Sequence, residues 1–438
     1  MIQKGDKKII RAWAFYDWAN SVYPLVITTA IFPMFYEAVT TTSLSTGETT
    51  DIVSFFGYHF KNTELYSYVS ALSFLIVSII SPVLSGIADY SDSKKRFLQF
   101  FCYLGALSCA CLYFFDTNYL EWSMLAVLLA SVGFWGSIVF YNAYLPEIAE
   151  RKDHDKVSAK GYALGYIGSS ILLIGNLVLI MAFDMPVKYS FLMVAIWWAG
   201  FSQYTYYYLP NSMHQHKDRA KKDRLTRGWK ELQKVWRQLK GLKIIKRYLL
   251  SFFIYSMGVQ TVMLMATLFA AKEIDWGTDG TKTGLIVSVI IIQFIAIGGA
   301  YFFSWFSKKV GNIASLSLSL TIWIGICIGA YFIYTPFEFY IIAAIVGFVM
   351  GGIQSLSRST YSKILPETTD HASFFSFYDV LEKIGIVIGT FVFGFLEGYS
   401  GSMRTSIFAL LSFFVVGLFV LLFVPKHPAI VGKSIKRV

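Results

Sequence analysis

The chain has 438 residues, of which 55% are hydrophobic, 18% aromatic and only 15% charged, and its formal net charge is +11. Soluble domains carry about 25% charged residues, and the apolar residues of this chain fall into long blocks, so an ordinary water-soluble protein is excluded. A bilayer core roughly 30 Å thick requires about 20 apolar residues per helical span. The composition therefore predicts a polytopic α-helical integral membrane protein.

Apolar blocks predict the membrane helices. The first six lie near 12–38, 64–88, 97–116, 119–145, 159–183 and 187–210. A basic linker follows at 211–247, and the second six blocks lie near 248–272, 283–306, 312–334, 337–361, 374–396 and 404–424. We expect an all-α membrane fold with 12 transmembrane helices, arranged as two pseudo-symmetric six-helix bundles at 1–210 and 248–438.

The basic residues predict the orientation of these helices. Of the 38 Lys and Arg residues, 32 lie in segments on the side of both termini and the linker, five lie in segments on the other side, and Lys383 lies within a helix. Cytoplasmic segments carry the excess of Lys and Arg, so both termini should be cytoplasmic, in a cell inner or plasma membrane. No basic run accompanies a nucleic-acid-binding module, so we expect no nucleic-acid partner.

The linker contains an amphipathic pattern. Its apolar residues recur at helical spacing, at Trp229, Leu232, Trp236, Leu239 and Leu242. Basic residues take the other faces, at Lys230, Lys234, Arg237 and Lys240. This pattern predicts a helix lying on the cytoplasmic leaflet, with lysines toward anionic lipid; a helix that binds a regulatory partner is the alternative.

A short motif recurs in the two halves. The fourth block ends with Tyr141–Glu147 (YNAYLPE) and the tenth with Tyr361–Glu367 (YSKILPE), so that Tyr, Leu, Pro and Glu return at identical spacing. The proline explains a helix stop in each half. Internal symmetry of this kind is typical of transporters built from repeats around a site at the membrane midplane.

The segment between the second and third helices, Ser85–Arg96, contains Asp89 followed by Lys94, Lys95 and Arg96. It resembles the loop signature of the major facilitator superfamily, in which an Asp caps one helix while basic residues latch a neighbour. The corresponding stretch of the second half, 304–311, has Lys308 near the expected acid. We therefore expect a latch in the first half rather than the second, formed by Asp89, Lys94, Lys95 and Arg96. The alternative is that these basic residues only determine topology.

Several motifs lie along nearly the whole chain, at Phe15–Ser21, Gly161–Gly168, Gly351–Ser359, Phe374–Tyr378 and Lys383. Together they resemble the autophagy-linked vacuolar amino-acid effluxer family and its bacterial relatives, within the major facilitator superfamily. One departure is Met257, where the family pattern has an acid. The resemblance implies the major facilitator fold and the export of small solutes, with amino acids as the leading class.

Charged residues within the helices indicate a gate. A charge at the centre of a membrane helix costs about 2.5–3.5 kcal/mol, so it is usually paired or functional. Asp379 and Lys383 are four residues apart and should pair within one helix. We expect these two to form a charge network with Asp17, Arg358 and Glu382 near the cytoplasmic gate, and Glu382 is the candidate for protonation. A static cluster near the headgroups is the alternative.

Polar and aromatic side chains within the blocks indicate a substrate cavity. An amide in hydrocarbon needs a hydrogen-bond partner, and amides occur in the first, seventh, eighth and tenth blocks. We expect the first, fourth, seventh and tenth helices to line a largely uncharged cavity. Its predicted residues are Tyr16, Asn20, Tyr166, Tyr255, Gln260, Gln293 and Gln354. Each could instead only join helices. The glycines Gly161, Gly165 and Gly168 should let the fifth helix approach a neighbour closely.

Signatures of catalysis are absent from the sequence. There is no phosphate-binding P-loop, the cysteines lack metal-ligand spacing, and all six histidines are predicted to lie in loops. We expect no enzyme activity, no cofactor and no metal site. The predicted function is secondary active transport of a small solute, with proton or cation coupling and with membrane lipid as its surroundings. A transport-inactive receptor with this fold and a lipid or drug exporter are the alternatives; the sequence does not define the oligomeric state.

Overall fold

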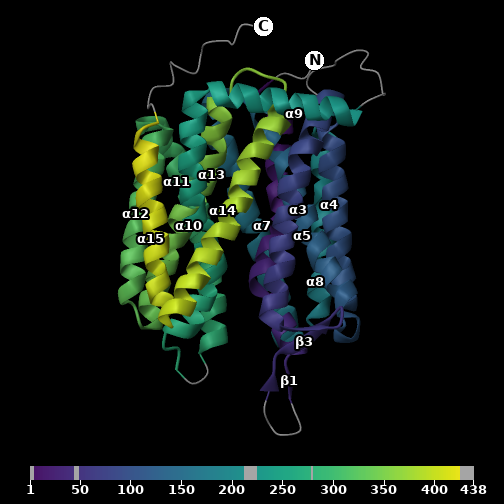
Figure 1. Ribbon diagram of the computed structural model, residues 1–438, viewed down its shortest axis with the longest axis vertical. Helices are drawn as coiled ribbons and strands as arrows, with labels where there is room; N and C mark the ends of the chain where they lie inside the picture. The colour runs from purple at the N-terminus through teal and green to yellow at the C-terminus, as the bar shows by residue number, and fades with distance from the viewer. Residues whose placement is uncertain (1–3, 44–48, 212–223, 278–279, 425–438) are drawn as a thin grey trace.

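The computed structural model describes residues 4–43, 49–211, 224–277 and 280–424, which are almost entirely helical. The long helices stand roughly parallel in two bundles, one from each half of the chain (Figure 1). Large apolar side chains such as Leu107, Ile196 and Phe391 are exposed on the helices, as expected for faces that contact lipid. The arrangement confirms the predicted fold class.

The first bundle contains six long helical segments, the first of them broken. In chain order its elements are α1 (Lys7–Asn20), η1 (Tyr23–Ala30), α2 (Phe32–Thr40), α3 (Asn62–Ser91), α4 (Lys94–Cys111), η2 (Leu112–Phe114), η3 (Thr117–Tyr119), α5 (Leu120–Ala143), α6 (Leu145–Ile148), η4 (Arg151–Asp153), α7 (His154–Phe183) and α8 (Lys188–Tyr208).

The second bundle follows the linker helix α9 (Arg224–Gly241). It consists of α10 (Lys243–Glu273), α11 (Thr281–Val310), α12 (Asn312–Phe332), α13 (Pro336–Ile364), α14 (His371–Ser400) and α15 (Met403–Leu422). In the described part of the chain, ten helices are long and apolar enough to cross a membrane. The two remaining long helices of the bundles are α8 in the first and α14 in the second.

The two ends of the bundles differ, and we name them by what they carry. The linker side is the end at which α1 begins, α15 ends and α9 lies (Figure 1). The hairpin side is the opposite end, where β1 (Thr42–Ser43) pairs with β2 (Thr49–Thr50), and β3 (Ile52–Phe55) with β4 (Tyr58–Lys61). The β3–β4 turn contains Phe56 and Gly57, both with positive φ, as a tight hairpin requires.

The first span is not the single helix predicted for 12–38. It consists of α1, the π-helical segment η1 and α2. Pro24 lies at the start of η1, and proline has no N–H to continue the α-helical ladder. The Pro24 carbonyl accepts hydrogen bonds from the hydroxyls of Thr28 at 2.6 Å and Thr29 at 2.8 Å. Such π-bulges occur frequently at functional sites.

The glycines of α7 bring it close to α1. A Cβ built on Gly165 would lie 2.4 Å from Ser21 Oγ, and one on Gly168 would lie 2.7 Å from the Trp18 carbonyl oxygen. Only glycine permits this separation of the two helices. The predicted close approach is confirmed.

The linker forms the predicted helix, but its apolar face is divided. Leu232 and Leu239 are buried together with Val235, in a helix that contacts α3, α10 and α14. Trp229 and Trp236 remain about half exposed, at 51% and 50%. The leucines therefore pack against protein rather than against lipid, which corrects the prediction for that part of the face.

Candidate functional site

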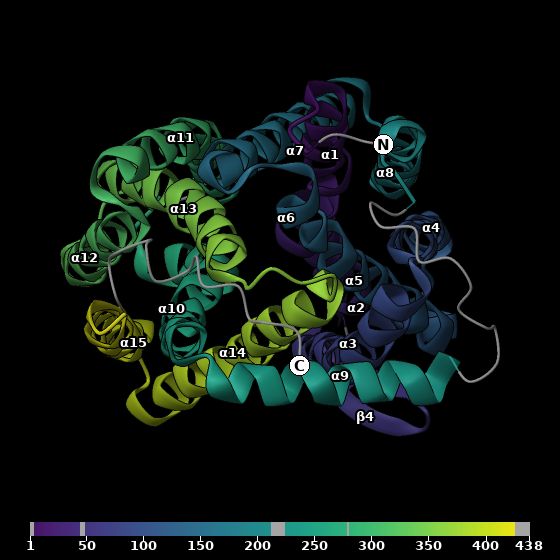
Figure 2. The same ribbon diagram turned by 90° about the horizontal axis from the view of Figure 1, so that it is seen from above.

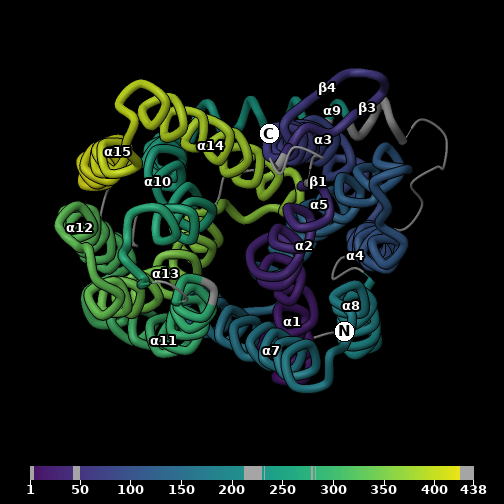
Figure 3. The backbone as a smooth tube through the Cα atoms, turned by 90° about the horizontal axis from the view of Figure 1, so that it is seen from below, coloured from purple at the N-terminus to yellow at the C-terminus, as the bar shows by residue number. Residues whose placement is uncertain are grey.

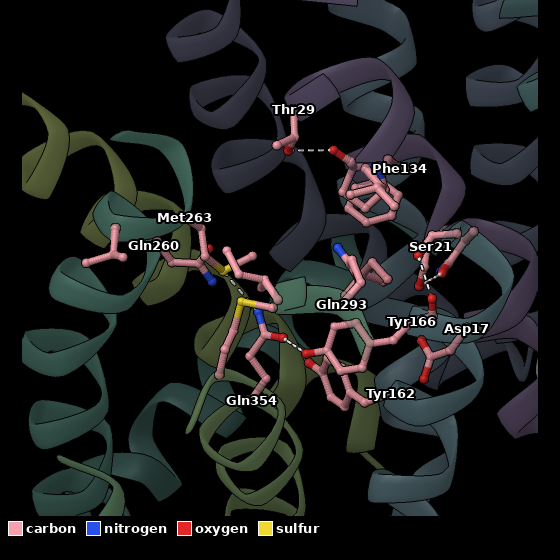
Figure 4. Close-up of a pocket in the computed structure, with 18 of the residues that line it drawn as sticks. Asp17, Ser21, Thr29, Phe134, Tyr162, Tyr166, Gln260, Met263, Gln293 and Gln354 are labelled. Carbon is pink, nitrogen blue, oxygen red and sulfur yellow. Dashed lines mark hydrogen bonds between the residues drawn. The ribbon is translucent and has the colours of Figure 1, made fainter. Parts of the chain in front are cut away.

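A cavity of about 200 Å³ lies between the two bundles. Figure 4 shows polar and aromatic side chains converging on it from both bundles. Five of the predicted cavity residues line it: Asn20, Tyr166, Gln260, Gln293 and Gln354. The four helices expected to line it do so (α1 with η1, α5, α10 and α13), and residues of α7, α11 and α14 complete the wall.

Two predicted cavity residues lie elsewhere. Tyr16 is fully buried among Tyr141 and Tyr206, because it lies on the face of α1 that packs into its own bundle. Tyr255 lies behind the cavity, in a small side pocket that it shares with Glu382, and its hydroxyl lies 2.7 Å from Ser357 Oγ.

The polar groups of the cavity are partly paired with one another. The Tyr166 hydroxyl donates to Gln354 Oε1 at 2.6 Å and thereby joins the two bundles, and Gln260 Nε2 donates to Glu382 Oε1 at 2.8 Å. Asn20 Nδ2 and Gln293 Oε1 are buried and have no partner among the described residues. An unpaired buried polar atom is costly, and both of these atoms belong to residues that line the cavity.

Arg358 of α13 is the centre of the first charge cluster, the Arg358 cluster. Its guanidinium donates to Asp17 Oδ2 at 3.2 Å, to Asn142 Oδ1 at 3.3 Å, and to Ser158 at both Oγ (2.9 Å) and the carbonyl oxygen (3.0 Å). Tyr141 donates to the same Asp17 oxygen at 2.7 Å. All these partners belong to the first bundle, so the cluster joins the two bundles through a buried ion pair.

The second charge cluster, the Lys383 cluster, lies in the second bundle. Lys383 Nζ is 2.5 Å from Asp379 Oδ1 and 3.0 Å from Glu382 Oε2, which confirms the predicted pair within one helix. The ammonium also lies 3.8 Å from the centre of the Trp135 ring in the first bundle. The five charges predicted to form one network therefore form two clusters, because Asp17 and Arg358 satisfy each other across the interface.

The loop signature produces a third cluster, the Asp89 cluster. Asp89 accepts hydrogen bonds from the backbone N–H groups of Ala372 at 3.1 Å and Ser373 at 2.7 Å, so it caps α14 of the other bundle. Lys94 forms an ion pair with Glu147, and His371 Nδ1 lies 3.0 Å from the same carboxylate.

The other two predicted latch residues do not join this cluster. Lys95 donates to the Leu209 carbonyl oxygen at 2.8 Å, within its own bundle. Arg96 is exposed, because it lies on the outer face of α4.

A fourth cluster, the Asp155 cluster, was not predicted. Asp155 of α7 accepts from Ser307, Asn312, Ser359 and Lys363 of the other bundle, at 2.7, 2.8, 2.7 and 2.5 Å. The sequence favoured contacts at the loop of the first half over the corresponding loop of the second half, and the structure shows contacts at both. The sequence signal was weak because Lys308 lies near the position of the expected acid, and the contacts come instead from the neutral side chains of Ser307 and Asn312.

The expectation that all histidines lie in loops is also wrong. His154 and His371 are buried first residues of α7 and α14, and His59 lies in β4. His214, His216 and His427 lie outside the described residues. In the described part of the chain, no group of His, Cys, Asp and Glu could hold a metal ion.

The contacts between the bundles are asymmetric. Every hydrogen bond that we find between the bundles in the described residues lies at the level of Gln354 or nearer to the linker side. The clusters of Asp89 and Asp155 lie on opposite sides of the molecule, one between α3 and α14 and the other between α7 and α11 to α13 (Figure 3). The linker side is thus closed by polar contacts around the cavity.

Comparisons with known proteins agree with this geometry. The model of the family described as "Vacuole effluxer Atg22 like" matches residues 5–433. An uncharacterized MFS-type transporter of Bacillus subtilis, YxiO, is 31% identical over 97% of each chain. Autophagy-related protein 22 of Yarrowia lipolytica is 23% identical over 85% of this chain and 78% of its own length.

Solved structures show the same fold at low sequence identity. The major facilitator transporter FucP in its outward conformation has a TM-score of 0.68 and 14% identity, covering 96% of this chain and 99% of its own. The human organic anion transporter MFSD10 has a TM-score of 0.67 and 10% identity, covering 96% of this chain and 100% of its own.

Proposed function

Because the chain belongs to the Vacuole effluxer Atg22-like family of major facilitator transporters, we propose that it exports a small polar solute by alternating access. The observation that carries this proposal is the polar cavity, because the hydrogen bonds that we find between the bundles in the described residues lie at the cavity or on its linker side. A rocking motion that breaks these bonds would open the cavity to the linker side, as in carriers that move one bundle against the other around a fixed site.

We further propose that the chain crosses the membrane 12 times, with the linker side and both termini in the cytoplasm. The concentration of Lys and Arg on that side supports this orientation. The proposed units are 1–210, 211–247 and 248–438. The membrane is a cell inner or plasma membrane, where the exposed apolar helix faces contact lipid.

Amino acids are the proposed class of solute. The motifs that resemble those of vacuolar amino-acid effluxers support this class, and so do the charges around the cavity. Asp17, Asp379 and Glu382 carry three negative charges against the two positive charges of Arg358 and Lys383. One negative charge is left over, in the Lys383 cluster, and both Glu382 of this cluster and Asn20 line the cavity. An ammonium group would neutralise it, and a carboxylate or carbonyl could accept from Asn20.

Counterflow tests the proposal directly. Purified protein in proteoliposomes loaded with unlabelled amino acid should accumulate the same labelled amino acid transiently, because a carrier exchanges solute across the membrane. Binding without exchange would contradict transport and favour a receptor. Exchange of a lipid or an apolar drug in place of every amino acid tested would contradict the solute class.

Coupling to protons is proposed at the Lys383 cluster. Glu382 lines the cavity and shares the Lys383 ammonium with Asp379, so a proton can reach Glu382 from the cavity and neutralise the excess charge. Glu382→Gln should therefore abolish the pH dependence of transport, measured as counterflow and net uptake across a pH series. Glu397→Gln, on the hairpin side, is the control and should retain it. An unchanged pH profile in Glu382→Gln would remove Glu382 as the proton site.

A further inference from the structure

The linker helix α9 lies at the perimeter of the molecule and not beneath its centre. Figure 2 shows it running along the edge of the two bundles, past α14 and α3. Its buried residues Leu232, Val235 and Leu239 face the protein. Because the bundles span a membrane, a helix at their edge and level with their ends lies at the height of the lipid headgroups.

This helix is attached to both bundles. Gly241 at its end lies just before α10, and Lys234 Nζ lies 2.8 Å from Asp370 Oδ2 in the second bundle. The centre of the Trp236 ring lies 5.5 Å from the centre of the Phe377 ring. In the first bundle α9 contacts α3. Asp370 is the N-cap of α14, next to the backbone groups that Asp89 holds, so α9 crosses the α3–α14 junction at the Asp89 cluster.

The outer flank of α9 combines tryptophans with cations. Trp229 and Trp236 are about half exposed and lie seven residues apart, hence on one flank. Lys230, Arg237 and Lys240 are exposed beside them, and the Lys240 ammonium lies 5.5 Å from the centre of the Trp236 ring. Tryptophan favours the membrane–water interface, and each nearby Lys or Arg is attracted to an anionic leaflet.

We propose that this flank of α9 is a binding surface for anionic phospholipid headgroups, and that bound lipid holds α9 across the α3–α14 junction. Opening the linker side separates α3 from α14, so it requires α9 to leave one of them. Anionic lipid therefore favours the state in which the linker side is closed. Lipid is the occupant because the flank lies at the perimeter of a membrane protein and carries interfacial tryptophans beside cations.

Hydrogen exchange of the full-length protein tests this proposal. The protein is placed in nanodiscs of phosphatidylcholine alone or of phosphatidylcholine mixed with phosphatidylglycerol, and exchange is followed by mass spectrometry over residues 224–241. We expect exchange to be slower by about fivefold or more in the anionic discs, given three cations near the headgroups. High salt should reduce the difference.

Two charge variants locate the effect. The triple variant Lys230→Gln, Arg237→Gln, Lys240→Gln should lose the difference between the lipids. The matched control Lys308→Gln, Lys309→Gln removes two exposed cations of α11 on the same side of the molecule and should keep it.

Three outcomes would overturn the proposal. The first is equal exchange of wild-type α9 in the two kinds of nanodisc, and the second is a lipid-dependent difference in exchange that persists in the triple variant. The third is that soluble polyglutamate, added to phosphatidylcholine discs, slows exchange of α9 as much as anionic lipid does. The last would assign the flank to a soluble acidic partner. The wild-type comparison does not depend on the folding of any variant, so the proposal stays testable if the triple variant is unstable.

Discussion

Arg358 illustrates how one buried charge is made tolerable inside a membrane protein. It is 2% exposed and donates four hydrogen bonds to partners in the other bundle. Its guanidinium also lies 4.2 Å from the centre of the Tyr162 ring. Among the described residues, Asp17 is the carboxylate that forms an ion pair with Arg358. Removing one member of a buried pair leaves the other uncompensated, which costs far more than the pair itself contributes.

A double-mutant cycle on Asp17 and Arg358 should therefore reveal strong coupling. Asp17→Asn and Arg358→Met should each lower the free energy of unfolding of the purified protein, and the double variant should lose less than the sum. We expect a coupling free energy of about 2–3 kcal/mol. The matched control is the exposed pair Lys272–Glu397, for which about 0–1 kcal/mol is expected. Additive losses for Asp17 and Arg358 would contradict the assignment.

At the residue scale, the sequence predicted local pairs better than distant ones. Asp379 and Lys383 could be paired because four residues make one helical turn. Asp17 and Arg358 are 341 residues apart, and nothing in either helix specifies the other as its partner. Asp155 was missed because a carboxylate in the first turn of a helix normally lies in water, where it needs no partner. Here it is 1% exposed and accepts hydrogen bonds from three helices of the other bundle, α11, α12 and α13.

At the scale of elements, the packing of α7 against α1 controls the Arg358 cluster. Gly161 is the position of α7 that faces the ion pair. A Cβ there would lie 2.3 Å from Asp17 Oδ2 and 3.0 Å from Arg358 Nη2. Gly175, two turns beyond Gly168 in the same helix, has no atom within 4 Å of its built Cβ. Substituting Gly161 and Gly175 in turn therefore separates the effect of a packing clash from the effect of higher helix propensity.

Gly161→Ala should displace the ion pair and lower both thermal stability and transport, whereas Gly175→Ala should do neither. Alanine favours a helix over glycine by roughly 0.5–1 kcal/mol, so Gly175→Ala should leave the melting temperature unchanged or raise it. Counterflow and thermal unfolding in detergent measure the two effects. Equal behaviour of the two variants would show that α7 does not position Asp17.

The elements themselves followed from hydropathy, apart from one break. Long apolar blocks predicted the helices because a span must satisfy all its backbone groups internally. The same pattern could not reveal η1. A helix can kink, end or widen into a π-helix at a proline such as Pro24. Which of these occurs depends on nearby side chains, here the hydroxyls of Thr28 and Thr29, which donate hydrogen bonds to the Pro24 carbonyl oxygen. The sequence could not show which apolar residues of α9 are buried against the bundles and which stay exposed, because leucine and tryptophan are both apolar.

At the scale of the whole molecule, the equal halves and the YxxxLPE repeat predicted two bundles, and the fold confirms them. The conformation could not be predicted. Both open states of a carrier consist of the same residues, and their relative free energy depends on small differences between the contacts of the two sides. In this structure the Asp89 and Asp155 clusters hold the bundles together on the linker side, and they lie at opposite edges of the bundle interface (Figure 3).

If the bundles move as rigid bodies, weakening both clusters should have multiplicative effects on opening. The reporter is Ile138→Cys in the cavity wall, with exposed Cys111 replaced by serine. An impermeant maleimide applied to the linker side of the reconstituted protein labels this thiol only when that side opens. Asp89→Asn and Asp155→Asn each weaken charge-assisted hydrogen bonds worth about 1.5–3 kcal/mol, so each should raise the labelling rate by about tenfold or more.

The double variant should then label at a rate close to the product of the two factors, because distant contacts that oppose one motion contribute additively to its free energy. Glu397→Gln on the hairpin side controls for loss of a carboxylate and should leave labelling unchanged. If the double variant labels no faster than the faster single variant, each cluster closes only a local flap. The two bundles would then not move as units, and alternating access by rigid-body rocking would be wrong for this protein.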